Sequence, residues 1–540
     1  MNPSSVRPGD IERGPIAAVV IVGFPLSIGL STRIPLWATV LVAVVLVSTV
    51  TVRIAGRTAA RWLLDGWEFR AGRAARARAR AMPADIIDVE IAAGVCGIRD
   101  AGTTLVAMIQ LAPNLDLPTV ISEKSLYTED TVPVRALLSM LDQFGLAVEI
   151  DIVTTGQRVR PSGGYSMLYD QLVGSHPLVG NRLTWLVVRL DLEHNLAALA
   201  RRGPAAVAGP KALAGAAHRI AGRLRERGIA AHALPAAALR EASRILHAGV
   251  ELTDLRETWG RLESSAPGRC VTSFSIDWSR LGETGLDDCW AWNRGRTTLV
   301  VSLTGATGSP RALVRFVGPE VTSTPDYLCP LGGRQSAALM ASLPMAGSVR
   351  ALPGERSGAD IAPADALDEL AIAIGPNGQI LGAISGQARH ALALPLFDPA
   401  RYNPRRRVID VHAALPVAQQ IVLRAMVVGA DIEVHSARPQ HWRRLVEEVG
   451  DPESLRMATE GGADSRTATI AVFDQLPPQA SAAPTTVSIS EPGGPRHRSP
   501  DLVIDQVGAM TVDVGIPMRT VRVDLIEPRG EARYFERPQS

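Results

Sequence analysis

The chain has 540 residues and a mass of 57.4 kDa, enough for two or three domains with sizeable hydrophobic cores. Apolar residues make up 46% and charged residues 20%, which excludes global disorder. The formal net charge of +2 and an aromatic content of only 4% give no indication of nucleic-acid binding. The cysteines lie far apart without a CxxC spacing, which excludes the usual zinc and disulfide frameworks and favours buried free thiols. They are Cys96, Cys270, Cys289 and Cys329.

Two uncharged, mostly apolar runs lie near the N-terminus, at residues 14–32 and 34–52. Each has 19 residues, so as a helix each would span roughly 28 Å, about one hydrocarbon core. We therefore expect a transmembrane helical hairpin over 14–52, with Arg33 in its turn and residues 1–13 in the cytoplasm. A cleaved signal peptide fits less well, because a second apolar run follows the first. A buried hairpin in a soluble protein is the other alternative.

Small residues in these runs would let neighbouring membrane helices approach closely. The candidates for such helix packing are Gly23, Ser27, Gly29, Ala38, Ala43 and Ser48.

A basic segment follows the apolar runs. Residues 53–80 contain eight arginines and carry a net charge of +6, whereas the turn between the runs has one arginine. The positive-inside rule therefore places both ends of the hairpin in the cytoplasm, with the basic segment 53–85 as a juxtamembrane helix or linker. A merely solvated arginine helix is the alternative. The side chains expected at the membrane interface are Arg53, Arg57, Arg61, Trp62 and Trp67.

The remaining chain predicts an α/β or α+β cytoplasmic body over 86–450, followed by a strand-rich region with flexible links over 451–540. A helix, a glycine stop and a strand recur in this body. The expected helices are 133–144, 211–227 and 416–428. The expected strands are 93–98, 103–111, 146–153, 183–190, 229–234, 271–276, 297–303, 312–317, 408–411, 431–435, 467–473, 485–489, 502–504 and 518–526.

Several catalytic motifs are absent from the sequence. No Gly-Lys pair exists, so there is no Walker A loop. HExxH, GxSxG, GxGxxG and a metal-binding DxD are also missing. The best enzymatic candidate is the set Asp410, His412 and His435, at the ends of two strands of a predicted βαβ unit, where ligands of parallel sheets bind. The interpretation that we favour for these residues is that they end strands and are satisfied by local hydrogen bonds.

Two further groups of polar residues favour structural roles. Asp170, Ser175 and His176 lie in one short stretch, and sequence neighbours rarely build a triad, so capping and turn roles are expected. Arg405, Arg406 and Arg407 precede a strand and predict a solvated or partner-facing edge more than a phosphate site.

The stretch 182–195 reads RLTWLVVRLDLEHN and resembles the EccE family, a membrane subunit of mycobacterial type VII (ESX) secretion systems. Its Arg-x-Thr-Trp and strand pattern match at Arg182, Thr184, Trp185 and Arg189, while Leu192 replaces the family's proline. The stretch 331–344 is similar to the family's Gly-Arg-Gln helix, carried here by Gly333, Arg334 and Gln335. The stretch 378–398 ends in LPLFD, like the family's glycine-rich hairpin.

This resemblance implies a non-catalytic structural subunit of the secretion complex in the plasma (inner) membrane, with most of the chain cytoplasmic and no catalytic, cofactor or metal residues. The subunit would anchor and brace the assembly that exports proteins. The implied partners are EccB, the ATPase EccC and EccD, together with the lipid bilayer and, at the far side, the mycosin protease. A membrane-anchored, degenerate transferase-like enzyme is the alternative function.

Overall fold

The fold is described from a computed structural model. It describes residues 37, 53–54, 57–81, 85–123, 125–161, 163–292, 295–303, 310–321, 323–349, 352, 366–458, 467–497, 499–517 and 519–535. The chain divides into two compact units, Met1–Ala79 and Arg80–Ser540.

The described part of the first unit is short. It consists of the strands β1 (Arg53–Ile54) and β2 (Arg57–Thr58), the helix α3 (Ala59–Ala71) and most of α4 (Arg73–Ala81). The expected basic segment is thus largely helical. The predicted membrane hairpin over 14–52 lies outside the described residues apart from Trp37. Among the helices that the structure describes, none combines the length and apolar character needed to span a bilayer.

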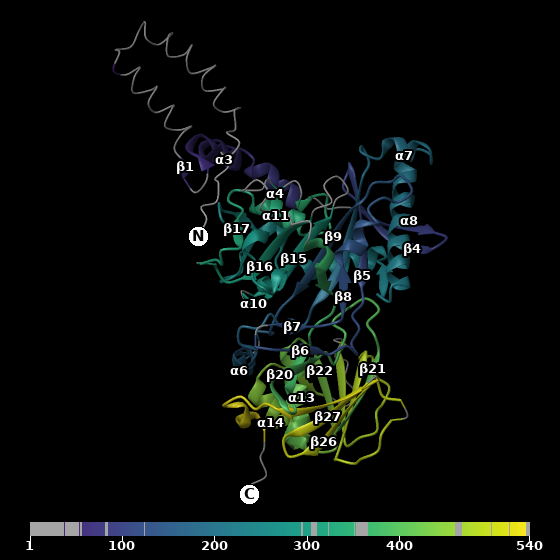
Figure 1. Cartoon of the computed structure of the whole chain (residues 1–540), viewed down its shortest axis with the longest axis vertical. Coiled ribbons are helices and arrows are strands. Elements are labelled where there is room, and N and C mark those ends of the chain that lie inside the picture. Colours follow the sequence, from purple (N-terminus) through teal and green to yellow (C-terminus); the bar gives the residue numbers. More distant parts are fainter. Residues whose placement is uncertain are drawn as a thin grey trace, which may run out of the picture. The chain divides into compact units, whose positions relative to one another are not determined.

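The second unit contains two large sheets and is a mixed α/β structure (Figure 1). The first sheet is antiparallel throughout its described pairings. Its strands in spatial order are β12 (Arg256–Glu257), β13 (Leu262–Glu263), β14 (Cys270–Ile276), β16 (Arg311–Gly318), β15 (Arg296–Leu303), β9 (Glu149–Gly156), β10 (Leu183–Asp191), β5 (Thr104–Leu111), β4 (Gly94–Asp100) and β3 (Ile86–Ile91), with β11 (Ala231–Ala233) beside β5 and β17 (Leu328–Pro330) beside β14.

Helices cover both faces of the first sheet. On one face, α8 (Ala205–Glu226) packs against β3, β4 and β5 (Figure 1), burying Leu213, Ala217, Ile220 and Leu224 at helical spacing. On the other face, α9 (Ala236–His247) and α11 (Gln335–Ala341) bury their apolar sides in a separate core. The central strand β10 is buried on both faces, which explains its continuous apolar run.

The second sheet is half parallel and half antiparallel. In spatial order it contains β23 (Leu455–Met457), β22 (Ile432–Ser436), β24 (Ile470–Asp474), β25 (Thr485–Ser490), β21 (Arg407–His412), β26 (Leu502–Gly508), β27 (Thr511–Ile516), β28 (Arg519–Leu525), β19 (Gln379–Ile384), β20 (Gln387–Leu394), β6 (Thr119–Ile121) and β7 (Leu126–Tyr127). The strands from β23 to β26 run parallel, and the rest pair antiparallel.

One apolar core joins the second sheet to the helices α6 (Gly163–Val173), α13 (Leu415–Val427) and α14 (Pro439–Val449). The chain leaves α13 through Gly429, whose φ is +121°. A Cβ at Gly429 would lie 2.8 Å from the Asn181 side-chain nitrogen, so only glycine fits this turn.

Shorter elements complete the unit. They are α5 (Val134–Leu138), α7 (Leu196–Ala200), α10 (Asp288–Ala291), α12 (Ala366–Glu369), the strand pair β8 (Thr131–Pro133) and β18 (Ala371–Ala373), and the 3₁₀ turns η1 (Leu252–Asp254), η2 (Trp278–Arg280), η3 (Gly285–Asp287) and η5 (Glu531–Tyr534).

The expected helix over 133–144 is wrong in length, because α5 ends at Leu138. Beyond it, the backbone N–H of Val148 donates to the Leu141 carbonyl at 2.9 Å, closing a turn instead of continuing the helix. The expected helices 211–227 and 416–428 are confirmed as α8 and α13, although α8 begins six residues earlier, and the predicted strands are confirmed within a few residues. The helices α6, α9 and α14, and strands such as β3, β23 and β27, were not expected.

The predicted βαβ unit is confirmed, since β21 and β22 are parallel strands of one sheet joined through α13. They are not neighbours, because β24 and β25 lie between them. Strands from beyond residue 450 therefore alternate in space with strands from before it. The predicted boundary at 450 does not separate two sheets.

Candidate functional site

Arg182 occupies an unusual position at the start of β10. Its side chain is among the most buried in the protein, at 1% exposure. The guanidinium lies with Nη2 3.5 Å from the Asn377 side-chain oxygen and with Cζ 5.3 Å from the Trp290 ring centre. Its Nε and Nη1 atoms have no hydrogen-bond partner within the described residues. A buried cation with free donors is costly, so this site calls for a functional explanation.

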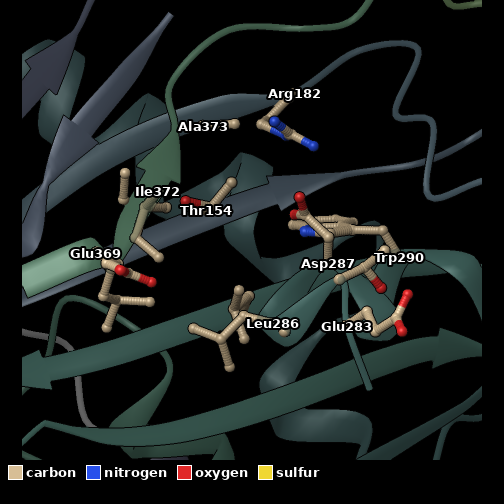
Figure 2. A pocket seen from close by; sticks show the side chains of 14 residues that line it. Thr154, Arg182, Glu283, Leu286, Asp287, Trp290, Glu369, Ile372 and Ala373 are labelled. Atoms are coloured by element: carbon tan, nitrogen blue, oxygen red, sulfur yellow. The ribbon is translucent and has the colours of Figure 1, made fainter. Parts of the chain in front are cut away.

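A cavity of about 300 Å³ lies beside this guanidinium. Figure 2 shows the Arg182 and Asp287 side chains directed toward the same space, with the Trp290 ring beside them and Glu369 on the opposite wall. The lining residues are Thr154, Arg182, Glu283, Thr284, Gly285, Leu286, Asp287, Trp290, Leu299, Glu369, Leu370, Ala371, Ile372 and Ala373.

Several separate elements build the cavity. Thr154 of β9, Leu299 of β15 and Arg182, just before β10, form its floor. The elements η3 and α10 supply Leu286, Asp287 and Trp290. The short elements α12 and β18 supply the remaining wall. The rim residues Glu283 and Glu369 are exposed, so the cavity communicates with solvent.

The electrostatics of the cavity balance positive and negative charge. Burial lowers the pKa of Arg182, and the negative charges of Asp287 and Asp130 oppose this shift. Burial likewise raises the pKa of Asp287, against the attraction of Arg182. In the part of the chain that the structure describes, no direct ion pair joins Arg182 to Asp287. Both residues instead line the same cavity.

The other matched positions of β10 have structural roles. Thr184 donates its hydroxyl to the Ile374 carbonyl at 2.8 Å, linking β10 to the chain that follows β18. Trp185 is 2% exposed, in the core on the opposite face of the sheet. Arg189 forms a buried ion pair with Asp151 and donates through Nε to the Met345 carbonyl at 2.8 Å.

The Gly333, Arg334 and Gln335 group lies away from the cavity, at the start of α11. Gln335 is buried and exchanges two hydrogen bonds with the Ser273 backbone, at 2.9 and 3.0 Å. The Gly333 N–H donates to the Trp259 carbonyl at 2.7 Å. These contacts fasten α11 to β14. The matched positions therefore divide between one cavity residue, Arg182, and residues that fix the packing around it.

The enzymatic candidate set does not converge. His412 Nδ1 lies 2.6 Å from the Asp505 carboxylate, and Asp410 pairs with His497 at 2.5 Å. His435 stacks on Phe473 at 4.7 Å between ring centres, on a strand three positions away from β21. At about 4.8 Å per strand, the two histidine positions are roughly 14 Å apart. Asp410, His412 and His435 therefore do not form one site, because β24 and β25 lie between their strands. The interpretation as strand-end residues with local hydrogen bonds is confirmed for Asp410 and His412.

The remaining polar candidates have local partners. His176 lies within hydrogen-bond distance of the Val173 and Ser122 carbonyls, and Asp170 pairs with Arg158 at 3.5 Å, as expected for structural roles. Arg405 and Arg407 both bind Asp116, at 2.6 and 3.0 Å. The predicted solvated edge is wrong for Arg407, whose side chain is fully buried, whereas the Arg405 side chain is 39% exposed.

The predicted membrane residues are described only in part. Gly23, Ser27, Gly29, Ala38, Ala43 and Ser48 lie outside the described residues. The side chains of Arg53, Arg57, Arg61 and Trp62 are also outside the description, and Trp67 is 71% exposed. Among the described residues, no group of histidine, cysteine or acidic side chains is placed to hold a metal ion.

Sequence reasoning missed the cavity partners of Arg182. Asp287 and Trp290 follow it by more than 100 residues, and Glu369 by more than 180. Neither their spacing nor their local pattern marks them, since only the fold brings them to β10.

The chain is similar to one known family over this region. The model of the EccE family, described as a putative type VII ESX secretion system translocon, matches residues 178–276, from just before β10 to the end of β14. The ESX-2 secretion system protein EccE2 of Mycobacterium tuberculosis is 26% identical over 463 residues, covering 81% of this chain and 82% of that protein.

Two other relatives are more similar over shorter alignments. The ESX-1 secretion system protein EccE1 of Mycolicibacterium smegmatis is 30% identical over 258 residues, covering 47% of this chain and 52% of the relative. The ESX-5 secretion system protein EccE5 of Mycobacterium marinum is 32% identical over 232 residues, covering 40% of this chain and 56% of the relative. The chain thus spans about half the length of these two relatives. Together, the family match and these relatives show that the chain is similar to EccE proteins of ESX-1, ESX-2 and ESX-5 secretion systems.

Proposed function

We propose that this chain is a non-catalytic subunit of a type VII secretion complex in the plasma membrane, which it anchors and braces. The observation that carries the proposal is the match of residues 178–276 to the EccE family, supported by relatives that belong to ESX-1, ESX-2 and ESX-5 systems. The sets of residues that the sequence offered for catalysis have structural partners, which is consistent with this role.

The anchoring part of the proposal rests on the sequence. The uncharged runs at 14–32 and 34–52 each have the length of a membrane span, and the arginines from Arg53 onward favour a cytoplasmic body. Small residues such as Gly23 and Gly29 would let the hairpin pack against membrane helices of a partner, for which we favour EccD.

The bracing part rests on the body. Buried polar contacts join the loops that lead into its two sheets. For example, the Val179 N–H, before β10, donates to the Asn377 side-chain oxygen, before β19, at 2.8 Å. A body of this kind could transmit force between EccB, EccC and EccD without moving parts of its own. The mycosin protease would meet the same complex from the far side.

The test is extraction of the tagged full chain from its own host in gentle detergent, followed by native electrophoresis and mass spectrometry of the band. We expect a band far above 57.4 kDa that contains a Walker-type ATPase and other membrane subunits. A lone monomer, under conditions in which the ATPase still runs as a large complex, would overturn the proposal.

The anchor is tested separately with the double variant Gly23→Leu/Gly29→Leu, which should reduce co-purification of the membrane partners. The matched control is Gly23→Ala/Gly29→Ala, which keeps both residues small and should co-purify as the wild type does. Equal co-purification of the leucine and alanine variants would contradict docking through this hairpin.

A further inference from the structure

The cavity around Arg182 has a specific chemical requirement. Arg182 is 1% exposed, and two of its guanidinium nitrogens have no partner within the described residues. Asp287 faces the same cavity from η3 (Figure 2). A guest that satisfies both groups must present a hydrogen-bond acceptor to Arg182 and a donor to Asp287.

The balance of charge selects among such guests. A simple anion would be attracted by Arg182 but repelled by Asp287 and by the rim carboxylates Glu283 and Glu369. A simple cation would be attracted by these carboxylates but repelled by the buried guanidinium of Arg182. A molecule with one positive and one negative group, and so no net charge, can place each group beside its opposite charge, on Asp287 and on Arg182.

The size and the lining of the cavity further restrict the class of molecule that fits it. Its volume of about 300 Å³ is at the lower end of the roughly 300–1,000 Å³ typical of ligand pockets. Leu286, Leu299, Ile372 and the face of Trp290 give it an apolar side next to the charged one. This combination suits a small molecule with an aliphatic group beside its charges.

We propose that this cavity binds a free α-amino acid with an aliphatic side chain. The free nitrogens of Arg182 are enclosed by protein in this structure, so the carboxylate of the amino acid binds the guanidinium after a small rotation of that side chain. The ammonium group of the amino acid binds Asp287. The aliphatic side chain packs on Leu286, Ile372 and Trp290. The site is separate from the proposed membrane docking, so it would couple the body of the subunit to a soluble metabolite.

The test is equilibrium dialysis of the purified full chain, in detergent, against radiolabelled L-leucine. We expect saturable binding of one leucine per chain. The analogues N-acetyl-L-leucine, without the ammonium group, and L-leucinamide, without the carboxylate, should each bind about tenfold more weakly or worse, since each loses a charge-assisted hydrogen bond.

The protein-side variant is Asp287→Asn, because Asp287 lies at the cavity surface and the change keeps the shape of the side chain. It should weaken leucine binding about tenfold or more. Asp85→Asn, at an exposed aspartate remote in sequence from the cavity-lining residues, is the matched control and should bind as the wild type does. Retained thermal unfolding behaviour of both variants shows that they are folded.

Three results would overturn the proposal: no saturable leucine binding at millimolar concentration, unchanged binding by Asp287→Asn, or equal binding of leucine and its two analogues. The cavity would then hold water only. Because the measurement uses the isolated chain, its outcome is independent of whether the chain joins a secretion complex.

Discussion

Asp130 is a carboxylate that the fold holds partly out of water near Arg182. Burial raises its pKa to about 6, although hydrogen bonds from the Asn114 and Gly375 N–H groups and the charge of Arg182 act in the opposite direction. Both N–H groups donate to the same oxygen, Oδ2. The ionised form is therefore less well solvated here than in the unfolded chain.

This pKa predicts a pH dependence of stability. The folded state binds the Asp130 proton more tightly than the unfolded state, whose value is 3.8, so the stability contributed by this group is full below about pH 4. It falls as the pH rises to about 6, by about 1–3 kcal/mol in total. Asp130→Asn keeps an oxygen for both N–H donors and removes the ionisation.

The stability advantage of Asp130→Asn over the wild type should therefore grow between pH 4 and pH 7, measured by urea denaturation at each pH. A difference that stays constant over this range would contradict a raised pKa.

The buried ion pair of Arg189 and Asp151 leads to a second prediction about stability at the level of single residues. Both side chains are almost fully buried, and the Asp151 carboxylate has one oxygen without a partner in the described structure. Arg189→Met leaves Asp151 as a buried, uncompensated charge, so we expect a loss of about 3–5 kcal/mol in the free energy of unfolding. In the double variant Arg189→Met/Asp151→Leu, where no buried charge is left alone, the loss should be smaller. If urea denaturation gave the same loss of unfolding free energy for the single and the double variant, the loss would come from packing and not from the buried charge.

At the level of secondary-structure elements, the start of α9 lies very close to β4. A Cβ on Gly97 would lie 2.6 Å from the Ala236 backbone nitrogen, and the Gly97 N–H donates to the Leu234 carbonyl at 2.8 Å. The start of α9 therefore touches the backbone of β4, which is possible only without a side chain at this position.

Gly97→Ala should accordingly push α9 away from the sheet and destabilise the protein by about 1–3 kcal/mol. The control is Gly260→Ala, where an added Cβ meets nothing within 4 Å, with an expected change of at most about 0.5 kcal/mol. Thermal unfolding of the two variants beside the wild type makes the comparison, and similar midpoints for both would refute the close contact.

The elements that were predictable have a local periodicity. The helix α8 shows its buried face in the spacing of Leu213, Ala217, Ile220 and Leu224, and β10 shows burial on both faces in its continuous apolar run. The helix α5 was predicted too long because the apolar residues from Leu137 to Leu146 also suit a packed turn. There the Val148 backbone N–H donates to the Leu141 carbonyl, which closes the turn.

At the scale of the whole molecule, the order of strands in the second sheet ties the end of the chain to its middle. β24 and β25 lie between β22 and β21, and β28 pairs with β19. Near the end of the chain, Glu531 pairs with Arg424 of α13 at 3.2 Å and accepts a hydrogen bond from Tyr165. The described strands after residue 450 are thus integral to this sheet.

A fragment of residues 80–450 should consequently fail to form the second sheet, because β21 and β22 lose the two strands between them. Limited proteolysis should degrade the part after residue 366 and spare residues 80–535 in the longer fragment used as a control. A protease-resistant 80–450 fragment that unfolds cooperatively would contradict this dependence.

The sequence by itself determined the mixed α/β character of the body, the helices α8 and α13, many of the strands and the resemblance to the EccE family, because periodicity, glycine stops and short motifs are local properties of the chain. The tertiary structure alone decided which polar residues meet. It separated His435 from His412 by inserting two strands, and it brought Asp287 and Trp290 to Arg182 from more than 100 residues away. Strand order depends on the summed packing of distant segments, and no local pattern carries that information.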